Sequence, residues 1–136
     1  MIENPSREEI KQILHKAKTI AVVGLSGNPE RTSYMVSEAM QNAGYKIIPV
    51  NPTVDKVLGE KSVRSLTDIQ EHVDIVNIFR RPEHLPEIAK DFDKMDADVF
   101  WAQLGVVNEE AYEFLKEKGY TTIMDRCIKV EHALTK

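Results

Sequence analysis

The sequence predicts an α/β fold, a doubly wound, mainly parallel sheet of five or six strands with helices on both faces. Short apolar runs rich in branched residues alternate along the chain with segments of helical periodicity. These runs are unbroken, as expected of strands that are buried on both faces. The 136 residues, 42% of them apolar, suit one domain covering residues 1–136 with a sizeable core.

An amphipathic helix is expected within residues 1–18. Ser6 and Glu9 have the spacing of a capping box, in which each side chain satisfies an amide group at the start of a helix. Apolar residues then recur at helical intervals. We expect this helix to pack on the rest of the domain.

A βαβ unit follows this helix. Residues 19–24 (TIAVVG) form the first buried strand, and residues 46–51 (KIIPVN) form the second. Between them, helical spacing starts at Ser33 and ends at Gly44, a residue that commonly closes a helix. Strand, helix and strand in about 30 residues form a crossover that is almost always right-handed.

The next segment is less regular. Residues 52–60 contain a proline and a glycine and are expected to form a loop, followed by a brief edge strand at residues 61–64. Ser65 and Asp68 then have the spacing of a cap for a short helix. Because Pro49 donates no hydrogen bond to a neighbouring strand, its neighbour on that side is expected to be the short edge strand.

The remaining strands are residues 74–79 (DIVNIF), 98–103 (DVFWAQ) and 121–126 (TTIMDR). A helix separates each successive pair, the second of them capped by Asn108, and a short helix ends the chain. In a doubly wound sheet, ligands bind outside the carboxyl ends of the strands, where the strand order reverses. The residues that follow each strand are therefore the candidates for function.

Composition excludes several classes of function. Eighteen basic residues against 22 acidic ones give a net charge of −4, and the basic residues are scattered, which disfavours nucleic-acid binding through phosphate neutralisation. No apolar run approaches the roughly 20 residues that cross a bilayer, so no membrane partner is expected. The one cysteine, Cys127, has no partner for an intramolecular disulfide, which favours a reducing compartment and a cytoplasmic protein.

The loop after the first strand, residues 24–33 (GLSGNPERTS), is a candidate anion site. Its amide groups and the positive end of the following helix suit a diphosphate, with serine hydroxyls as further donors and a left-handed glycine at Gly27. Alternatively, the glycines only permit a tight turn and Ser33 caps the helix. The candidate ligand-binding residues of this loop are Gly24, Ser26, Gly27, Asn28, Arg31 and Ser33.

Two familiar nucleotide motifs are absent. Ser26 and Pro29 stand where the dinucleotide fingerprint G-x-G-x-x-G has its second and third glycines. The second strand ends in Asn51 and Pro52, where an acidic residue would hold the ribose of NAD. Both departures argue against NAD, and the missing Walker pattern argues against a P-loop hydrolase.

Two cations follow the third long strand beside flat apolar side chains. Arginine grips phosphate through two hydrogen bonds, and an aromatic ring and a proline offer a surface for a purine. The alternative is a solvated turn whose arginines pair with Glu83 or Glu87. We favour the ligand role because the segment lies at the predicted switch point. Its candidates are Phe79, Arg80, Arg81 and Pro82.

The last two strands and the second loop add weaker candidates. Gln103 can donate to a ligand carbonyl, whereas Trp101 is expected in the core. Cys127 is interpreted as structural rather than nucleophilic because no histidine adjoins it. Lys56 is a weaker cation candidate. No metal site or catalytic residue is assigned, since the four histidines are dispersed: His15, His72, His84 and His132.

In combination, several stretches of the chain resemble the small bacterial and archaeal CoA-binding proteins. That family has a single Rossmann-like domain, similar to the N-terminal domain of the succinyl-CoA synthetase α subunit. The resemblance runs from about Ile20 to His132 and rests on the stretches IAVVGLSGNPERTSY, IIPVNP, VLGEKSVRSLTDI, VDIVNIFRRPE, VFWAQLG and MDRCIKVEH.

The resemblance implies coenzyme A as the ligand, lying across the carboxyl edge of the sheet. By this likeness residues 26–27 hold the diphosphate, the loop after residues 51–52 with Lys56 lies near the adenosine phosphate, residues 79–82 face the nucleotide and residues 102–104 line the pantetheine path. The synthetase's phosphohistidine belongs to a second domain that this chain lacks, so ligase activity is not implied.

The sequence thus favours a non-catalytic or regulatory protein that binds CoA or an acyl-CoA as its small-molecule partner. An enzyme acting on an acyl-CoA thioester, with Cys127 or Gln103 near the thiol, is the alternative. An NAD-type oxidoreductase is a weaker one.

Overall fold

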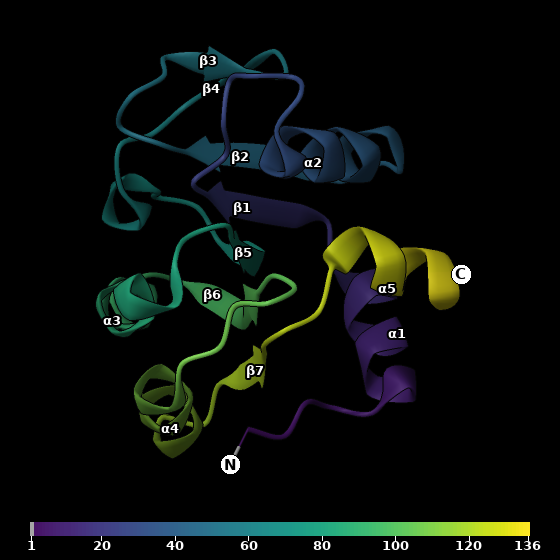
Figure 1. Cartoon of the computed structure of the whole chain (residues 1–136), viewed down its shortest axis with the longest axis vertical. Coiled ribbons are helices and arrows are strands. Elements are labelled where there is room, and N and C mark those ends of the chain that lie inside the picture. The colour runs from purple at the N-terminus through teal and green to yellow at the C-terminus, as the bar shows by residue number, and fades with distance from the viewer. Residues whose placement is uncertain (1) are drawn as a thin grey trace.

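The computed structural model describes residues 2–136 and contains a five-stranded parallel sheet, which confirms the predicted fold class (Figure 1). The first strand of the chain lies next to one edge of the sheet, the second strand forms that edge, and the later strands extend the sheet on the other side of the first. The order of the strands is β2 (Lys46–Val50), β1 (Thr19–Val23), β5 (Val73–Ile78), β6 (Ala97–Ala102) and β7 (Thr121–Ile123).

Helices cover both faces of the sheet, and Figure 1 shows the two groups on opposite sides of the strands. One apolar core lies under α1 (Arg7–Lys16), α2 (Thr32–Asn42) and α5 (Ile128–Leu134). The other lies under α3 (Leu85–Asp93), α4 (Glu109–Glu117) and the 3-10 turn η1 (Leu66–Asp68). In residues 2–136 no helix is both long and apolar enough to cross a membrane.

The predicted caps form where the sequence places them. Ser6 Oγ accepts a hydrogen bond from the Glu9 amide at 3.2 Å, so the first helix starts at Arg7. Asn108 Oδ1 accepts from the Ala111 amide at 2.9 Å and starts α4. Each cap satisfies an amide that would otherwise have no partner inside the helix.

The outer edge of β2 confirms the expectation for Pro49. The predicted edge strand at residues 61–64 is reduced to a single parallel bridge between Val50 and Val63. There the Val63 amide donates to the Pro49 carbonyl, and the Asn51 amide donates to the Val63 carbonyl, both at 2.9 Å. Pro49 therefore only accepts on this side, as its missing N–H requires.

The loop predicted at residues 52–60 is wrong in part, because this region contains a small hairpin. Its strands are β3 (Lys56–Val57) and β4 (Glu60–Lys61), which pair antiparallel. The two residues between them, Leu58 and Gly59, have φ of 54° and 78°. Two successive positive φ angles suit the tight turns of two-residue hairpins. Lys61 consequently belongs to the hairpin and not to the large sheet.

Candidate functional site

A pocket opens at the carboxyl edge of the sheet, at the switch point between β1 and β5. Its volume is about 650 Å³, within the range of small-molecule sites. The loops after β5 and β6, the start of α2 and the start of α5 contribute its walls. The lining residues are Thr32, Phe79, Arg80, Arg81, Pro82, Gln103, Leu104, Val106 and Cys127.

Gly24 brings two of these loops together. It follows β1 with a φ of +84°, and its amide donates to the Val50 carbonyl at 2.9 Å. A methyl group at this position would overlap the carbonyl oxygen of Phe79 and lie 3.1 Å from Cδ of Arg80. The missing side chain therefore lets the loop after β1 touch the loop after β5.

The polar side chains of the loop after β1 mainly hold the loop itself. Ser33 Oγ accepts from the Ser26 amide, and Ser26 Oγ accepts from the Asn28 amide, each at 3.0 Å. Asn28 Oδ1 accepts from the Glu30 amide at 3.0 Å. Ser33 thus lies inside α2, and Arg31 occupies the N-cap position without a side-chain cap. The alternative role for Ser33 as the helix cap is wrong.

The backbone amides of this loop that have no partner in the network are suited to bind an anion. Within residues 2–136, the amide groups of Gly27, Thr32 and Ser33 have no hydrogen-bond partner. Two of them open the 11-residue helix α2, where the helix dipole favours negative charge. The prediction that Gly27 adopts a left-handed conformation is wrong, because the φ of Gly27 is not positive.

The segment after β2 braces the same loop. Asn51 Nδ2 donates to the Leu25 carbonyl at 2.9 Å, while Asn51 Oδ1 accepts from the Thr53 amide at 2.9 Å. Both ends of the Asn51 side chain are therefore occupied. Pro52 and Lys56 are exposed, and Lys56 has no ion pair within the described part of the chain.

Arg80 and Arg81 are both exposed and both line the pocket. Within residues 2–136 neither forms an ion pair with Glu83, Glu87 or another carboxylate. The structure therefore does not contain the pairing that the alternative interpretation requires. The two guanidinium groups are available to an anionic ligand at the pocket mouth.

Gln103 and Trp101 connect β6 to the start of α5. Gln103 is 5% exposed, and its Oε1 accepts from the Ile128 amide at 3.0 Å. Trp101 is fully buried, as expected of a core residue, and its Nε1 donates to the Arg126 carbonyl at 2.8 Å. The end of β6 thereby fixes the backbone on either side of Cys127.

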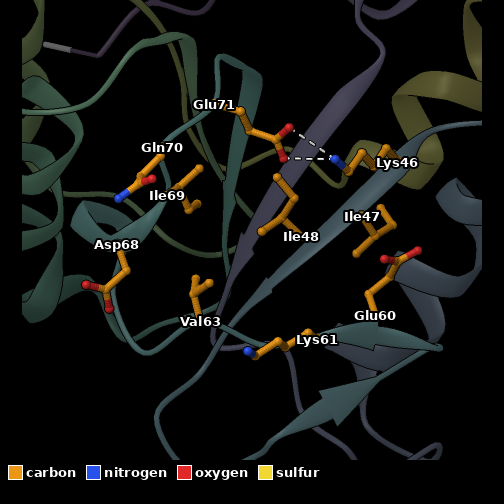
Figure 2. A pocket seen from close by; sticks show the side chains of 10 residues that line it. All are labelled: Lys46, Ile47, Ile48, Glu60, Lys61, Val63, Asp68, Ile69, Gln70 and Glu71. Carbon is orange, nitrogen blue, oxygen red and sulfur yellow. Dashed lines mark hydrogen bonds and ion pairs between the residues drawn. The ribbon is translucent and has the colours of Figure 1, made fainter.

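A second hollow lies away from this edge, along the outer side of β2 (Figure 2). It has a volume of about 460 Å³. Ile48, Val63 and Ile69 supply apolar walls, and the ion pair between Lys46 and Glu71, 2.9 Å from Nζ to Oε1, closes one end. Because Lys46 begins β2, this hollow belongs to the opposite half of the strand from the candidate site.

The amino edge of the sheet carries a cluster that the sequence analysis missed. His72 Nδ1 lies 2.8 Å from Asp96 Oδ1, and its Nε2 lies 3.0 Å from Asp98 Oδ2 and 3.4 Å from Asp74 Oδ1. His72, Asp74 and Asp98 could together hold a metal ion. Asp74 also accepts from the Lys18 and Thr19 amides, so ion pairs and hydrogen bonds account for the cluster.

This cluster predicts a pH dependence of stability. The hydrogen bond to Asp96, with the bond to Asp98, raises the pKa of His72 above its ordinary 6.5 against the opposing effect of burial. A raised folded-state pKa stabilises the fold below about pH 6.5, and this stabilisation is lost as the pH rises through the folded-state pKa. We expect a modest effect, because the cluster is exposed.

His72→Gln isolates this contribution. Urea unfolding across the pH range should give a free-energy difference between wild type and variant that shrinks as the pH rises. Burial lowers the pKa of His132, so the contribution of His132 to stability changes with pH in the opposite direction. Because His132 is present in both proteins, its contribution cancels in the difference between them. A difference that does not change with pH would contradict the assignment.

The fold and the site define a Rossmann-like α/β protein with a ligand pocket at the switch point of its sheet. Residues 18–133 match the family described as "CoA binding domain". The chain belongs to this family, which confirms the resemblance drawn from its motifs.

Relatives of similar length share nearly the whole chain. The uncharacterized protein YneT of Bacillus subtilis is 64% identical over 135 residues, covering 99% of this chain and all of YneT. A hypothetical protein of Pyrococcus horikoshii has a similar structure, with a TM-score of 0.92 and 34% identity over 99% of both chains. A Thermus thermophilus protein gives a TM-score of 0.87 with 36% identity over 97% of this chain and all of the other.

Part of the chain is also similar to a segment of larger enzymes. The ADP-forming acetate–CoA ligase of Methanocaldococcus jannaschii is 26% identical over 86 residues, which cover 63% of this chain but 12% of the ligase. The chain therefore matches a small segment of that enzyme.

Proposed function

We propose that this protein binds CoA or an acyl-CoA at the carboxyl edge of its sheet, as a non-catalytic or regulatory module of the cytoplasm. The observation that carries the proposal is the 650 Å³ pocket, which combines unpaired cations with apolar walls beside a helix start whose amides are unpaired. CoA has matching parts, an anionic diphosphate and a long, weakly polar pantetheine arm. Membership of the CoA binding domain family supports the same ligand.

The parts of the ligand can be assigned to parts of the site. The diphosphate accepts hydrogen bonds from the amides of Gly27, Thr32 and Ser33. Arg80 and Arg81 add charge-assisted hydrogen bonds, which are about twice as strong as neutral ones. Phe79 and Pro82 offer flat surface to the purine, with Lys56 toward the adenosine phosphate. The pantetheine arm passes Gln103.

The lining favours binding over catalysis. Among residues 2–136, the side chains that line this pocket include no histidine, aspartate or glutamate. Hydrolysis or transfer of a thioester needs a general base within hydrogen-bond reach of the nucleophile or of water. A binding module therefore suits the pocket better than the alternative of a thioester-processing enzyme. The ligase reaction of the longer relatives is not part of the proposal.

An NAD-type oxidoreductase is disfavoured by the environment of Asn51. The dinucleotide folds that bind NAD place a carboxylate there, which holds the ribose hydroxyls. Here the side chain of Asn51 is an amide, and its nitrogen and oxygen are already bonded to Leu25 and Thr53. The position lacks both the charge and the free oxygen for that role.

Thermal unfolding with and without ligand tests the proposal. CoA at about 100 times its dissociation constant should add about 2.7 kcal/mol to the free energy of unfolding and raise the melting temperature by about 10 °C. NAD at the same concentration should have little effect. Dephospho-CoA, which lacks the 3′-phosphate, should stabilise less than CoA because Lys56 loses its anion. Equal shifts with CoA and NAD, or no shift with CoA, would reject the proposed ligand.

A further inference from the structure

The pocket wall contains a thiol whose backbone is fixed on both sides. Cys127 lines the pocket, is partly exposed and directly precedes α5. The residue before it, Arg126, accepts at its carbonyl from Trp101 Nε1, and the residue after it, Ile128, donates its amide to Gln103 Oε1. Trp101 lies in strand β6, which pairs with β5 and β7, and Gln103 directly follows β6. The thiol therefore has a defined place relative to the sheet.

A second observation points to a ligand next to this thiol. Gln103 lines the same pocket and is buried, with a relative exposure of 5%. Its Oε1 is bonded to the Ile128 amide at 3.0 Å, but within residues 2–136 its Nε2 has no partner. This nitrogen is not among the fully buried polar side-chain atoms without a partner in residues 2–136, which are Ser37 Oγ and Asn77 Oδ1, so it remains accessible from the pocket that Gln103 lines. A carbonyl of a ligand in the pocket, such as an amide of a pantetheine arm, can accept this hydrogen bond.

We propose that Cys127 is a site of reversible modification by CoA disulfide bound in this pocket. The inference rests on the proposed function, because it uses the CoA molecule as the guide that delivers the disulfide. With the diphosphate at the start of α2 and the pantetheine arm passing Gln103, the sulfur end of the ligand lies in the pocket that Cys127 lines. Binding raises the effective concentration of the disulfide at the thiol.

The reaction is a thiol–disulfide exchange. The Cys127 thiol loses its proton, and the resulting thiolate attacks one sulfur of CoA disulfide. The bond between the two CoA sulfurs breaks as the bond between Cys127 Sγ and that sulfur forms. The second CoA leaves as a thiolate and takes up a proton. One disulfide is consumed and one is formed, so the oxidant is CoA disulfide itself.

Intact-mass measurement after incubation with CoA disulfide tests the proposal. The wild type should gain the mass of one CoA less two hydrogen atoms, and dithiothreitol should remove this mass. At low concentration the adduct should form about tenfold faster or more with CoA disulfide than with glutathione disulfide. Acetyl-CoA, which has no free thiol and occupies the same pocket, should slow the reaction with CoA disulfide. Cys127→Ser should form no adduct, because the chain has one cysteine.

The result is separable from that of the proposed function. No adduct, or equal rates with the two disulfides, overturns the role of Cys127. If CoA still raises the melting temperature of the wild type and of Cys127→Ser in that case, CoA binding stands and only the modification fails. If CoA stabilises neither protein and the rates are equal, both proposals fail.

Discussion

Gly24→Ala should lose about 3 kcal/mol of unfolding free energy and most of its affinity for CoA. An L-residue at a φ of +84° costs about 1–2 kcal/mol, and the new methyl group would overlap the Phe79 carbonyl oxygen, which adds about 1–3 kcal/mol for a forced backbone shift. The shift separates the loop after β1 from the loop after β5, which together form the pocket. Urea unfolding and CoA titration measure the two losses.

Two other glycines provide matched controls for this variant. Gly119 has a φ of +86° with nothing within 4 Å of a built methyl group, so Gly119→Ala should show the conformational cost alone. Gly27 lies in the same loop as Gly24, and a methyl group there would make an ordinary 3.5 Å contact with Val54 Cγ1. Gly27→Ala should therefore keep its stability. If Gly24→Ala were no less stable than Gly119→Ala, the close approach to Phe79 would be unimportant.

Arg80→Gln should bind CoA about tenfold to a hundredfold more weakly, with an unfolding free energy close to that of the wild type. A hydrogen bond to a charged group contributes about 1.5–3 kcal/mol, and Arg80 makes no ion pair within residues 2–136 that the substitution would break. Its Cδ lies against Gly24, beside the proposed diphosphate position. Isothermal titration with CoA measures the change.

Lys16→Gln removes the same charge from the opposite edge of the sheet, where α1 ends before β1. This control should bind CoA like the wild type, since charges more than about 10 Å apart are largely screened at ordinary salt concentrations. An equal loss of affinity in both variants would assign the effect to net charge rather than to a contact of Arg80.

The parts of the fold that depend on local pattern could be predicted from the sequence. The unbroken strands and the caps at Ser6 and Asn108 need only neighbouring residues to be recognised. The edge position of β2 also follows from one residue, because Pro49 lacks an amide donor. The hairpin that includes Leu58 was not predictable in this way, since Leu disfavours a positive φ and the usual Asn-Gly signal is missing.

The predicted site residues gather at one edge, but contacts between distant segments decide what each of them does. The sequence analysis predicted that Asn51 and Ser33 contact the ligand. In the structure Asn51 bonds to Leu25 and Ser33 bonds to Ser26, so both side chains hold the loop after β1 in place. The cluster around His72 was missed for a similar reason. His72 precedes β5 and Asp96 precedes β6, and only the register that pairs Val73 with Ala97 brings them together.

The single bridge along the outer edge of β2 also bears on self-association. An exposed strand edge is a template for edge-to-edge aggregation unless something interrupts it. Lys46 donates its amide toward β1, so the pleat turns the amide of Ile47 to the open side, and the next outward position is Pro49, which has no amide to offer. An incoming strand would therefore meet one donor, flanked by the Lys46–Glu71 ion pair and by the segment bonded at Val63. Pro49 therefore protects the partly unpaired edge of β2 against the addition of a strand from another molecule.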